Sequence, residues 1–319
     1  MLKPRILTIV AFAMITLLSF TSCVKDDDSS ENPFADAVVI GEDGVTSNGS
    51  RFISCDDRSF FLDSVLYEIY DAHISVVGCG KQTSGGEVKI FPRITYKKNT
   101  YDVALIVDEA FKNCANITSV VIPASVVIVG HNLFNDCLGL ERIVVESGNT
   151  MYDSRDNCNA IIETATNKLM CGCKTSVIPN GVTSIDESAF SGCTGLTSID
   201  FPNSLTSIGD RAFWGCSSLR SITIPEGVAQ IGIAAFYGCS SLTSITIPAS
   251  LASVGNWSFQ GCSNITEIHS FGATPPFRIS YSCFDDELYS QATLYVPQGC
   301  KKAYENTSGW NEFQNIVEE

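Results

Sequence analysis

The 319-residue chain is poor in basic residues and in histidine. It has 20 Lys and Arg against 35 Asp and Glu, which gives a formal net charge of −15. No basic stripe reverses this charge locally, so the sequence disfavours binding to nucleic-acid phosphates. The three histidines, His73, His131 and His269, lie outside HExxH motifs and lack the cysteine spacing of zinc sites. The sequence therefore predicts no metal site.

Motifs for catalysis are also missing. No G-x-S-x-G stretch marks a nucleophile, and the acidic residues are scattered rather than clustered. Cys171 and Cys173 are separated by one residue, unlike the usual C-x-x-C pairs. The glycines recur at a regular spacing, which is typical of turns and not of a phosphate-binding loop. We therefore expect no catalytic residue, no cofactor and no enzyme activity.

The first 22 residues have the pattern of an export signal. Lys3 and Arg5 precede an apolar run over residues 6–20, which is too short for an ordinary membrane-spanning helix. The run ends in the letters FTSC, a small-residue stop followed by Cys23, and this stretch resembles a bacterial lipobox. The resemblance implies cleavage before Cys23 and acylation of its thiol and new amine. A plain secretory signal followed by a chance cysteine is the alternative.

An acidic segment follows this cysteine, with Asp26, Asp27 and Asp28 in a row. So many like charges cannot pack in a core, which predicts a solvated tether over residues 23–40. The segment also resembles the acidic export signal after the lipidated cysteine in surface lipoproteins of anaerobic Gram-negative bacteria. That resemblance implies an outer-membrane lipoprotein exposed at the cell surface. A linker without an export role is the alternative.

Most of the remaining chain repeats with a period of 23 residues. The stretch FWGCSSLRSITIPEGVAQIG begins at residue 213, and FYGCSSLTSITIPASLASVG begins 23 residues later. One longer coil covers residues 146–178, where apolar residues on both sides of Thr166–Lys168 predict a β-hairpin. The repeated phenylalanines are Phe111, Phe134, Phe190, Phe213, Phe236 and Phe259.

Each repeat is too small to fold alone. Leu219, Ile222 and Ile224 predict a first strand that ends at Pro225, because proline cannot donate to a β-ladder. A second short extended segment and a turn at the phenylalanine follow. About five buried apolar side chains, at about 1.5–3 kcal/mol each, cannot offset ordering the repeat at roughly 1–2 kcal/mol per residue. Neighbouring repeats must therefore stack, and the sequence predicts a β-rich repeat solenoid.

The repeat LTSITIP…LASVG…SFQGC resembles the BspA-type leucine-rich repeats of bacterial surface proteins. Residues 65–104 resemble that family's N-terminal β cap, and the last 28 residues, from Ala292 to Glu319, resemble its closing strand and helix. We therefore expect a β cap over residues 41–99, a leucine-rich-repeat solenoid over 100–271 and a strand–helix cap over 272–319. The resemblance implies surface exposure and binding, and it does not imply an enzyme.

Fourteen cysteines in an exported chain would normally indicate disulfides. Six of them follow the repeat period, directly after the phenylalanine turn, where leucine-rich repeats place Asn or Cys. A free cysteine at such a position behaves as a small hydrophobe with a weak S–H donor. We predict buried thiols for this cysteine column, which comprises Cys114, Cys137, Cys193, Cys216, Cys239 and Cys262.

Two sets of outward positions are candidate ligand contacts. The first is a small-polar face on the first strands, and a solvated sheet without a ligand is the alternative. The second is a group of large aromatics where other coils carry small or polar residues, since Trp and Tyr are favoured in binding hot spots. These aromatics would otherwise fold down and cover the coil edge. The polar face comprises Ser198, Asp200, Ser221, Thr223, Ser244 and Thr246, and the aromatics are Trp214, Tyr237 and Trp257.

The sequence thus predicts a lipid-anchored cell-surface solenoid that acts as a binding or adhesion module. Its ligand would be a host protein, another cell or a glycan, and it would contact the membrane through the lipid anchor only. A passive structural or spacer subunit of a surface assembly is the alternative. A binder needs a chemically uneven outer face and a spacer does not, so the aromatic group favours the binder.

Overall fold

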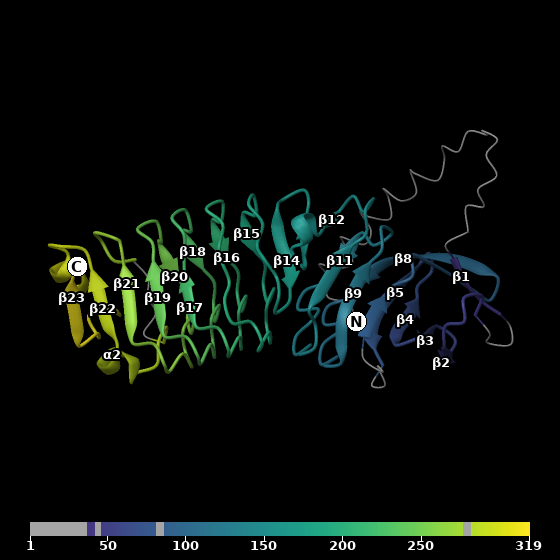
Figure 1. Ribbon diagram of the computed structural model, residues 1–319, viewed down its shortest axis with the longest axis horizontal. Coiled ribbons are helices and arrows are strands. Elements are labelled where there is room, and N and C mark those ends of the chain that lie inside the picture. Colours follow the sequence, from purple (N-terminus) through teal and green to yellow (C-terminus); the bar gives the residue numbers. More distant parts are fainter. Residues whose placement is uncertain (1–36, 42–45, 81–85, 277–281) are drawn as a thin grey trace.

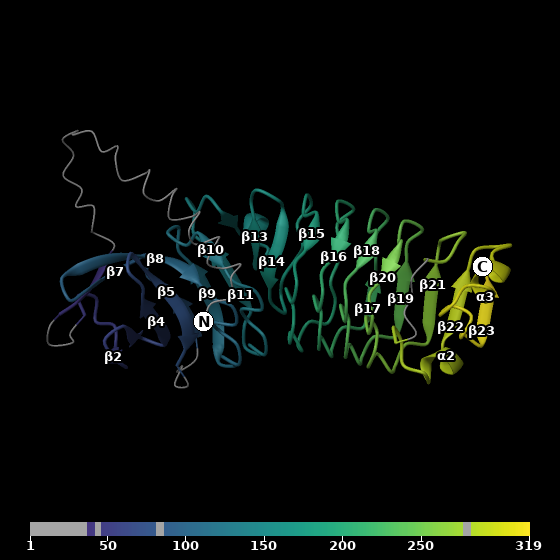
Figure 2. The same cartoon turned by 180° about the vertical axis from the view of Figure 1, so that it is seen from behind.

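The computed structural model of the chain describes residues 37–41, 46–80, 86–276 and 282–319. They form an elongated rod with a sheet at the N-terminal end, a stack of coils along its length and a short cap at the C-terminal end (Figure 1). The view from behind shows the same order of elements (Figure 2). Cys23, Asp26, Asp27 and Asp28 lie outside the described residues, so their predicted roles remain predictions.

A mixed eight-stranded sheet forms the N-terminal end of the rod. Its strands run in the order β1-β7-β8-β5-β4-β3-β2, and β10 of the coil stack pairs parallel to β8. Phe60 and Tyr67 are fully buried beneath it, so the sheet has its own apolar face against the stack. The strands are β1 (Ala37–Ile40), β2 (Phe52–Ser54), β3 (Ser59–Leu62), β4 (Val65–Ile69), β5 (His73–Cys79), β7 (Arg93–Tyr96), β8 (Asn99–Ile106) and β10 (Ile128–Val129).

The first strands of the coils form two separate parallel sheets. Side chains alternate along them, so in β17 Ile222 is buried while Ser221 and Thr223 are exposed. The shorter sheet comprises β6 (Gly86–Lys89), β9 (Ile117–Ile122) and β11 (Arg142–Val145). The longer one comprises β17 (Ser221–Thr223), β19 (Ser244–Ile247), β21 (Glu267–Ser270), β22 (Thr293–Val296) and β23 (Asn315–Glu318).

The second strands form one continuous seven-stranded sheet that begins with the long coil. Its regular members are only two residues long, because each is confined between two turns of its coil. The strands are β12 (Tyr152–Asp153), β13 (Ala160–Glu163), β14 (Lys168–Gly172), β15 (Ser184–Ile185), β16 (Ser207–Ile208), β18 (Gln230–Ile231) and β20 (Ser253–Val254). The stacked parallel coils confirm the predicted repeat solenoid.

The repeated phenylalanines form a continuous stack inside the turns. Phe190, Phe213, Phe236 and Phe259 are fully buried, with successive ring centroids 5.0, 5.1 and 5.3 Å apart. Phe284 extends the stack by one more ring at 5.3 Å, although it lies outside the predicted repeats. We refer below to the turn around each repeated phenylalanine as a Phe turn. Stacking explains why one coil requires the same residue as the next.

The cysteine column lies directly beneath the Phe turns. The Cys216 thiol donates to the carbonyl oxygen of Phe190 at 3.2 Å, and the Cys262 thiol donates to Phe236 at 3.1 Å. Free thiols are therefore confirmed at five of the six positions, with Cys193 partly exposed. The prediction is wrong for Cys114, which forms a disulfide with Cys79. Cys79 ends β5 of the N-terminal sheet, and a repeat pattern cannot show that this strand lies beside the first turn.

The long coil contains the predicted hairpin and divides the hydrophobic core. Strands β13 and β14 pair antiparallel, with a register shift after Ile161. Ile161 and Met170 face a cluster of buried residues on the N-terminal side, whereas Ile162 and Leu169 face a second cluster on the C-terminal side. The hairpin is thus a two-sided partition within the rod. A short 3-10 helix, Arg155–Asn157, precedes it.

A strand, a short helix and a last strand follow the stack at the C-terminal end. Strand β22 pairs with β21, helix α3 (Lys301–Glu305) follows, and β23 pairs with β22. Helix α2 (Leu288–Gln291) precedes this segment. Trp310 is fully buried here and its indole N–H donates to the carbonyl of Pro276 at 3.2 Å. None of the helices in the described ranges has the length and apolarity of a membrane-crossing segment.

Candidate binding surface

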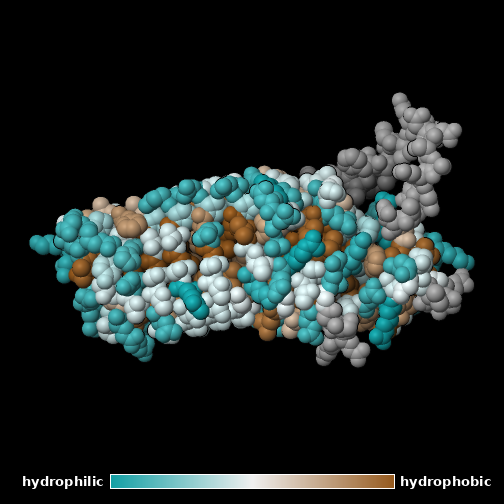
Figure 3. Space-filling view, in the orientation of Figure 1, coloured by the Kyte–Doolittle hydropathy of each residue, from teal (hydrophilic) through white to brown (hydrophobic). Residues whose placement is uncertain are grey.

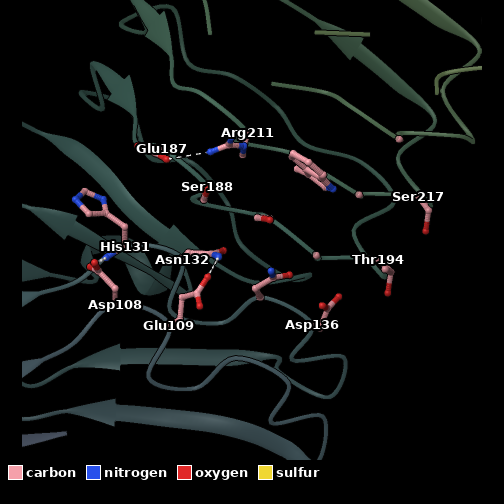
Figure 4. A pocket seen from close by; sticks show the side chains of 16 residues that line it. Asp108, Glu109, His131, Asn132, Asp136, Glu187, Ser188, Thr194, Arg211 and Ser217 are labelled. Carbon is pink, nitrogen blue, oxygen red and sulfur yellow. Dashed lines mark hydrogen bonds and ion pairs between the residues drawn. The ribbon is translucent and has the colours of Figure 1, made fainter. Parts of the chain in front are cut away.

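An open groove interrupts the surface of the rod where the long coil is inserted. It has a volume of about 950 Å³ and lies between the Phe turn at Phe134 and the turns at Phe190 and Phe213. Carboxylate, amide and hydroxyl side chains line it, together with one indole and one guanidinium (Figure 4). This mixture of groups suits reversible recognition of a ligand.

The groove exists because the long coil has no Phe turn of its own. In its place Gly172 of β14 lies directly under Phe190, and a Cβ added there would come within 2.2 Å of the ring. The turn at Phe134 is consequently followed in space by the turn at Phe190. The two turns approach at Gly192, where an added Cβ would lie 2.2 Å from the Asn135 side-chain oxygen.

An ion-pair network connects the two sides of this interruption. His131 Nδ1 lies 3.0 Å from Asp186 Oδ2, and Lys168 Nζ lies 3.3 Å from the other carboxylate oxygen. The contact with Asp186 raises the pKa of His131. Burial opposes ionisation of Asp186, but His131 and Lys168 outweigh it and lower the pKa of the carboxyl. The network thus holds the Phe134 side of the groove to the long coil and the Phe190 turn.

Carboxylates dominate the rest of the lining. Asp108 Oδ1 accepts a hydrogen bond from the His131 backbone N–H at 2.9 Å, and Glu109 Oε1 accepts one from Asn132 Nδ2 at 3.0 Å. Asp136 is exposed, and its side chain points into open space near the mouth of the groove (Figure 4). Glu187 Oε1 lies 3.5 Å from Arg211 Nη1 on the opposite side. This electrostatic environment favours neutral or cationic groups over anions.

The predicted aromatic residues lie on consecutive coils beside this groove. The Trp214 and Tyr237 rings have centroids 4.9 Å apart, and Trp214 also lines the groove. The Arg211 guanidinium lies over the indole at 5.6 Å. Trp214 is 38% exposed and Trp257 is 47% exposed, whereas Tyr237 is half-buried.

Trp257 occupies a strained backbone position. Its φ of 60° matches the left-handed conformation of its counterparts Ser188, Arg211 and Ala234, at 57°, 53° and 53°. Such a conformation is unfavourable for a bulky side chain. The coil geometry therefore imposes this backbone on whichever residue stands there, and the indole of Trp257 is 47% exposed. The four residues are 23 positions apart in the sequence, so the repeat spacing also groups them.

The predicted small-polar face is shorter than expected. Ser221 pairs with Ser244 and Thr223 with Thr246 in the register of β17 and β19, as the repeat predicts. Ser198 and Asp200 are exposed, but they lie outside any named strand. The expectation of a first strand in every coil is thus wrong at this point. The long coil pairs through the second-strand sheet instead, so the first-strand sheet ends at β11 and resumes at β17.

The described residues show no group of three or more His, Cys, Asp or Glu side chains arranged to hold a metal ion. On the side of the rod shown in Figure 3, hydrophobic residues reach the surface in patches that hydrophilic residues border.

A stack of parallel coils with a 23-residue period is typical of a leucine-rich-repeat protein. The chain matches the BspA type leucine rich repeat region in six copies, over residues 93–170 and 160–291. It belongs to this family. Repeats of this kind expose extended surfaces that solenoid proteins use for binding. No curated protein matches the chain.

Several solved structures are similar to the chain. One is a leucine rich repeat protein of T. pallidum, with 26% identity and a TM-score of 0.37, covering 65% of this chain and 82% of that one. Another, from Eubacterium ventriosum, has 15% identity and a TM-score of 0.49, covering 84% and 85%. A leucine rich cell surface protein of Faecalibacterium prausnitzii has 18% identity and a TM-score of 0.35, covering 84% and 96%.

Proposed function

We propose that the protein is a lipid-anchored binding or adhesion module of the bacterial cell surface, which recognises a ligand through Trp214, Tyr237 and Trp257. The exposure of two indoles on the Phe213 and Phe259 turns, with Tyr237 on the coil between them, carries this proposal. Their counterparts one repeat earlier are Ser191 and Ala234, so packing of the coil does not require them. A rigid backbone that already holds large rings at the surface loses little entropy when a ligand contacts them.

The binding role is tested by truncating one aromatic at a time. Trp214→Ala should lower binding of the purified protein to host or neighbouring cells by about tenfold or more, since a hot-spot aromatic contributes about 2 kcal/mol or more. Phe271→Ala is the matched control, because Phe271 is 53% exposed at the C-terminal end of the stack. Equal binding by both variants would leave a spacer role as the better description.

The anchor is tested separately in cells. Cys23→Ala should release the protein from the membrane, as followed by fractionation and by mass spectrometry of the mature N-terminus. Replacing Asp26, Asp27 and Asp28 by Ala should keep lipidation and reduce the amount of protein that external protease removes from whole cells. A Cys23→Ala protein that stays with the membrane would contradict the lipid anchor, and unchanged protease removal would contradict the export signal alone.

A further inference from the structure

Ile233 is a further exposed apolar residue on the same run of Phe turns as the aromatics. Ile233 is 43% exposed, and its backbone carbonyl accepts a hydrogen bond from the Arg211 backbone N–H at 2.8 Å. The Arg211 guanidinium in turn lies over the Trp214 ring. The equivalent residues of the other coils are polar, namely Glu187, Asp210 and Asn256. An isoleucine therefore departs from the polar character of this column, and it is left 43% exposed. We define the apolar patch as Trp214, Ile233, Tyr237 and Trp257, on three consecutive coils.

The apolar patch continues into the groove through Trp214, which belongs to both. Four carboxylates line the groove against one guanidinium and one imidazole. An apolar centre bordered by a polar, charged region is the usual anatomy of a protein–protein interface. The excess of negative charge specifies the complementary sign on the partner. The carboxylates are Asp108, Glu109, Asp136 and Glu187, and the basic groups are Arg211 and His131.

Arg211 shows how a cation is accommodated at the junction of patch and groove. Its guanidinium lies 3.5 Å from the Glu187 carboxylate and 5.6 Å from the centre of the Trp214 ring. A carboxylate on one side and an aromatic face on the other stabilise a cation by charge and by cation–π attraction. Asp136, across the groove, offers a second exposed carboxylate whose side chain points toward solvent (Figure 4).

We propose that the apolar patch and the groove form one docking surface for a protein partner. The partner's contact segment would place an apolar side chain on the patch and a lysine or arginine in the groove, within reach of Asp136. This inference rests on the binding function proposed above and adds the class of ligand. A neutral glycan could donate hydroxyl hydrogen bonds to these carboxylates but gains no net charge attraction from them, whereas a lysine or arginine gains both. An acidic polysaccharide is repelled by the same charge.

A library of random twelve-residue peptides displayed on phage is the probe for this surface. Selection on the intact protein should enrich peptides that combine Lys or Arg with Trp, Phe, Leu or Ile. A synthetic copy of an enriched peptide should bind about tenfold or more weakly to the Trp214→Ala variant. It should also bind several-fold more weakly to the Asp136→Asn/Glu187→Gln variant, and more weakly at high salt.

The matched control carries the same change in net charge at the other end of the rod. Asp286→Asn/Glu312→Gln removes two exposed carboxylates of the C-terminal cap and should leave peptide binding unchanged. Equal loss in this control would mean diffuse attraction by an acidic protein and would overturn the proposal. Enriched peptides without a basic residue, or no enrichment, would also overturn it.

Failure of the proposal and failure of the binding function give different results. If a glycan array yields a neutral glycan whose binding requires Trp214 while no peptide is enriched, the binding function stands and the protein partner is wrong. If peptides are enriched at this surface but Trp214→Ala leaves cell binding unchanged, the docking surface stands and the cell-binding role is wrong.

Discussion

Truncation of one ring in the phenylalanine stack should remove a large part of the solenoid's stability. Phe213 is fully buried between Phe190 and Phe236, at centroid distances of 5.0 and 5.1 Å. Phe201 adds an edge-on contact at 5.7 Å. Phe213→Ala therefore leaves a cavity between two rings that the flanking coils hold in place. A core Phe→Ala substitution costs about 3–5 kcal/mol, and the rigid coils on both sides favour the upper end of this range.

Phe213→Leu separates the contribution of volume from that of stacking. Leucine keeps most of the buried apolar area but loses two stacked ring pairs, which contribute about 0.5–1.5 kcal/mol each. We expect this variant to lose about 1–3 kcal/mol. In a double-mutant cycle with Phe236→Leu, the coupling energy should be about 0.5–1.5 kcal/mol, since the two rings are in direct contact.

Urea unfolding followed by both circular dichroism and tryptophan fluorescence measures these changes. The two probes are needed because long repeat arrays can depart from two-state unfolding. Phe271→Ala provides the control and should change the free energy of unfolding by less than about 0.5 kcal/mol, because the ring is 53% exposed. A loss below about 1.5 kcal/mol for Phe213→Ala, or no coupling with Phe236, would refute the structural role of the stack.

Two further predictions concern the thiols and the ion pairs. Cys216 should react with a maleimide once the protein is denatured, without any reductant. Cys79 and Cys114 should react only when the protein is both denatured and reduced. Mass spectrometry of the labelled peptides would reveal any other bridge. The raised pKa of His131 means that its ion pair with Asp186 stabilises the fold fully below about pH 6.5 and progressively less as pH rises through the raised value. His131→Gln should therefore destabilise more at pH 5.5 than at pH 8.5, by at most about 1 kcal/mol because the imidazole is half exposed; an equal effect at both pH values would contradict this.

The periodic part of the fold could be predicted from the sequence because every coil buries the same positions. Residues such as Leu219, Ile222 and Phe236 recur at one spacing, and the spacing itself requires stacking. The hairpin in the long coil was predictable for a similar reason, since apolar residues flank a short polar turn. Single events that break the period were not predictable. The Cys79–Cys114 disulfide joins the cap to the first turn, and no repeat pattern links those two residues.

The candidate surface was predictable only in part. Comparison of repeats identified Trp214, Tyr237 and Trp257, and the same comparison could have identified Ile233, whose counterparts are all polar. The groove could not be found in this way. It depends on the approach of His131 and the Asp186 segment, which belong to turns on opposite sides of the long coil. Which turns become neighbours depends on where the hairpin leaves the stack, and sequence spacing does not specify this.

The β13–β14 hairpin separates two hydrophobic clusters, and we expect them to behave as two cooperative folding units. Each unit has its own set of buried side chains, and the alternating residues of the hairpin lie between the two sets. Local unfolding can then proceed in one unit while the other stays intact. Amide hydrogen exchange should show one level of protection over residues 86–145 and another over residues 182–270, with the change falling at the hairpin. A protein held to the membrane near its N-terminus would thus present its aromatic surface on the unit farther from the anchor.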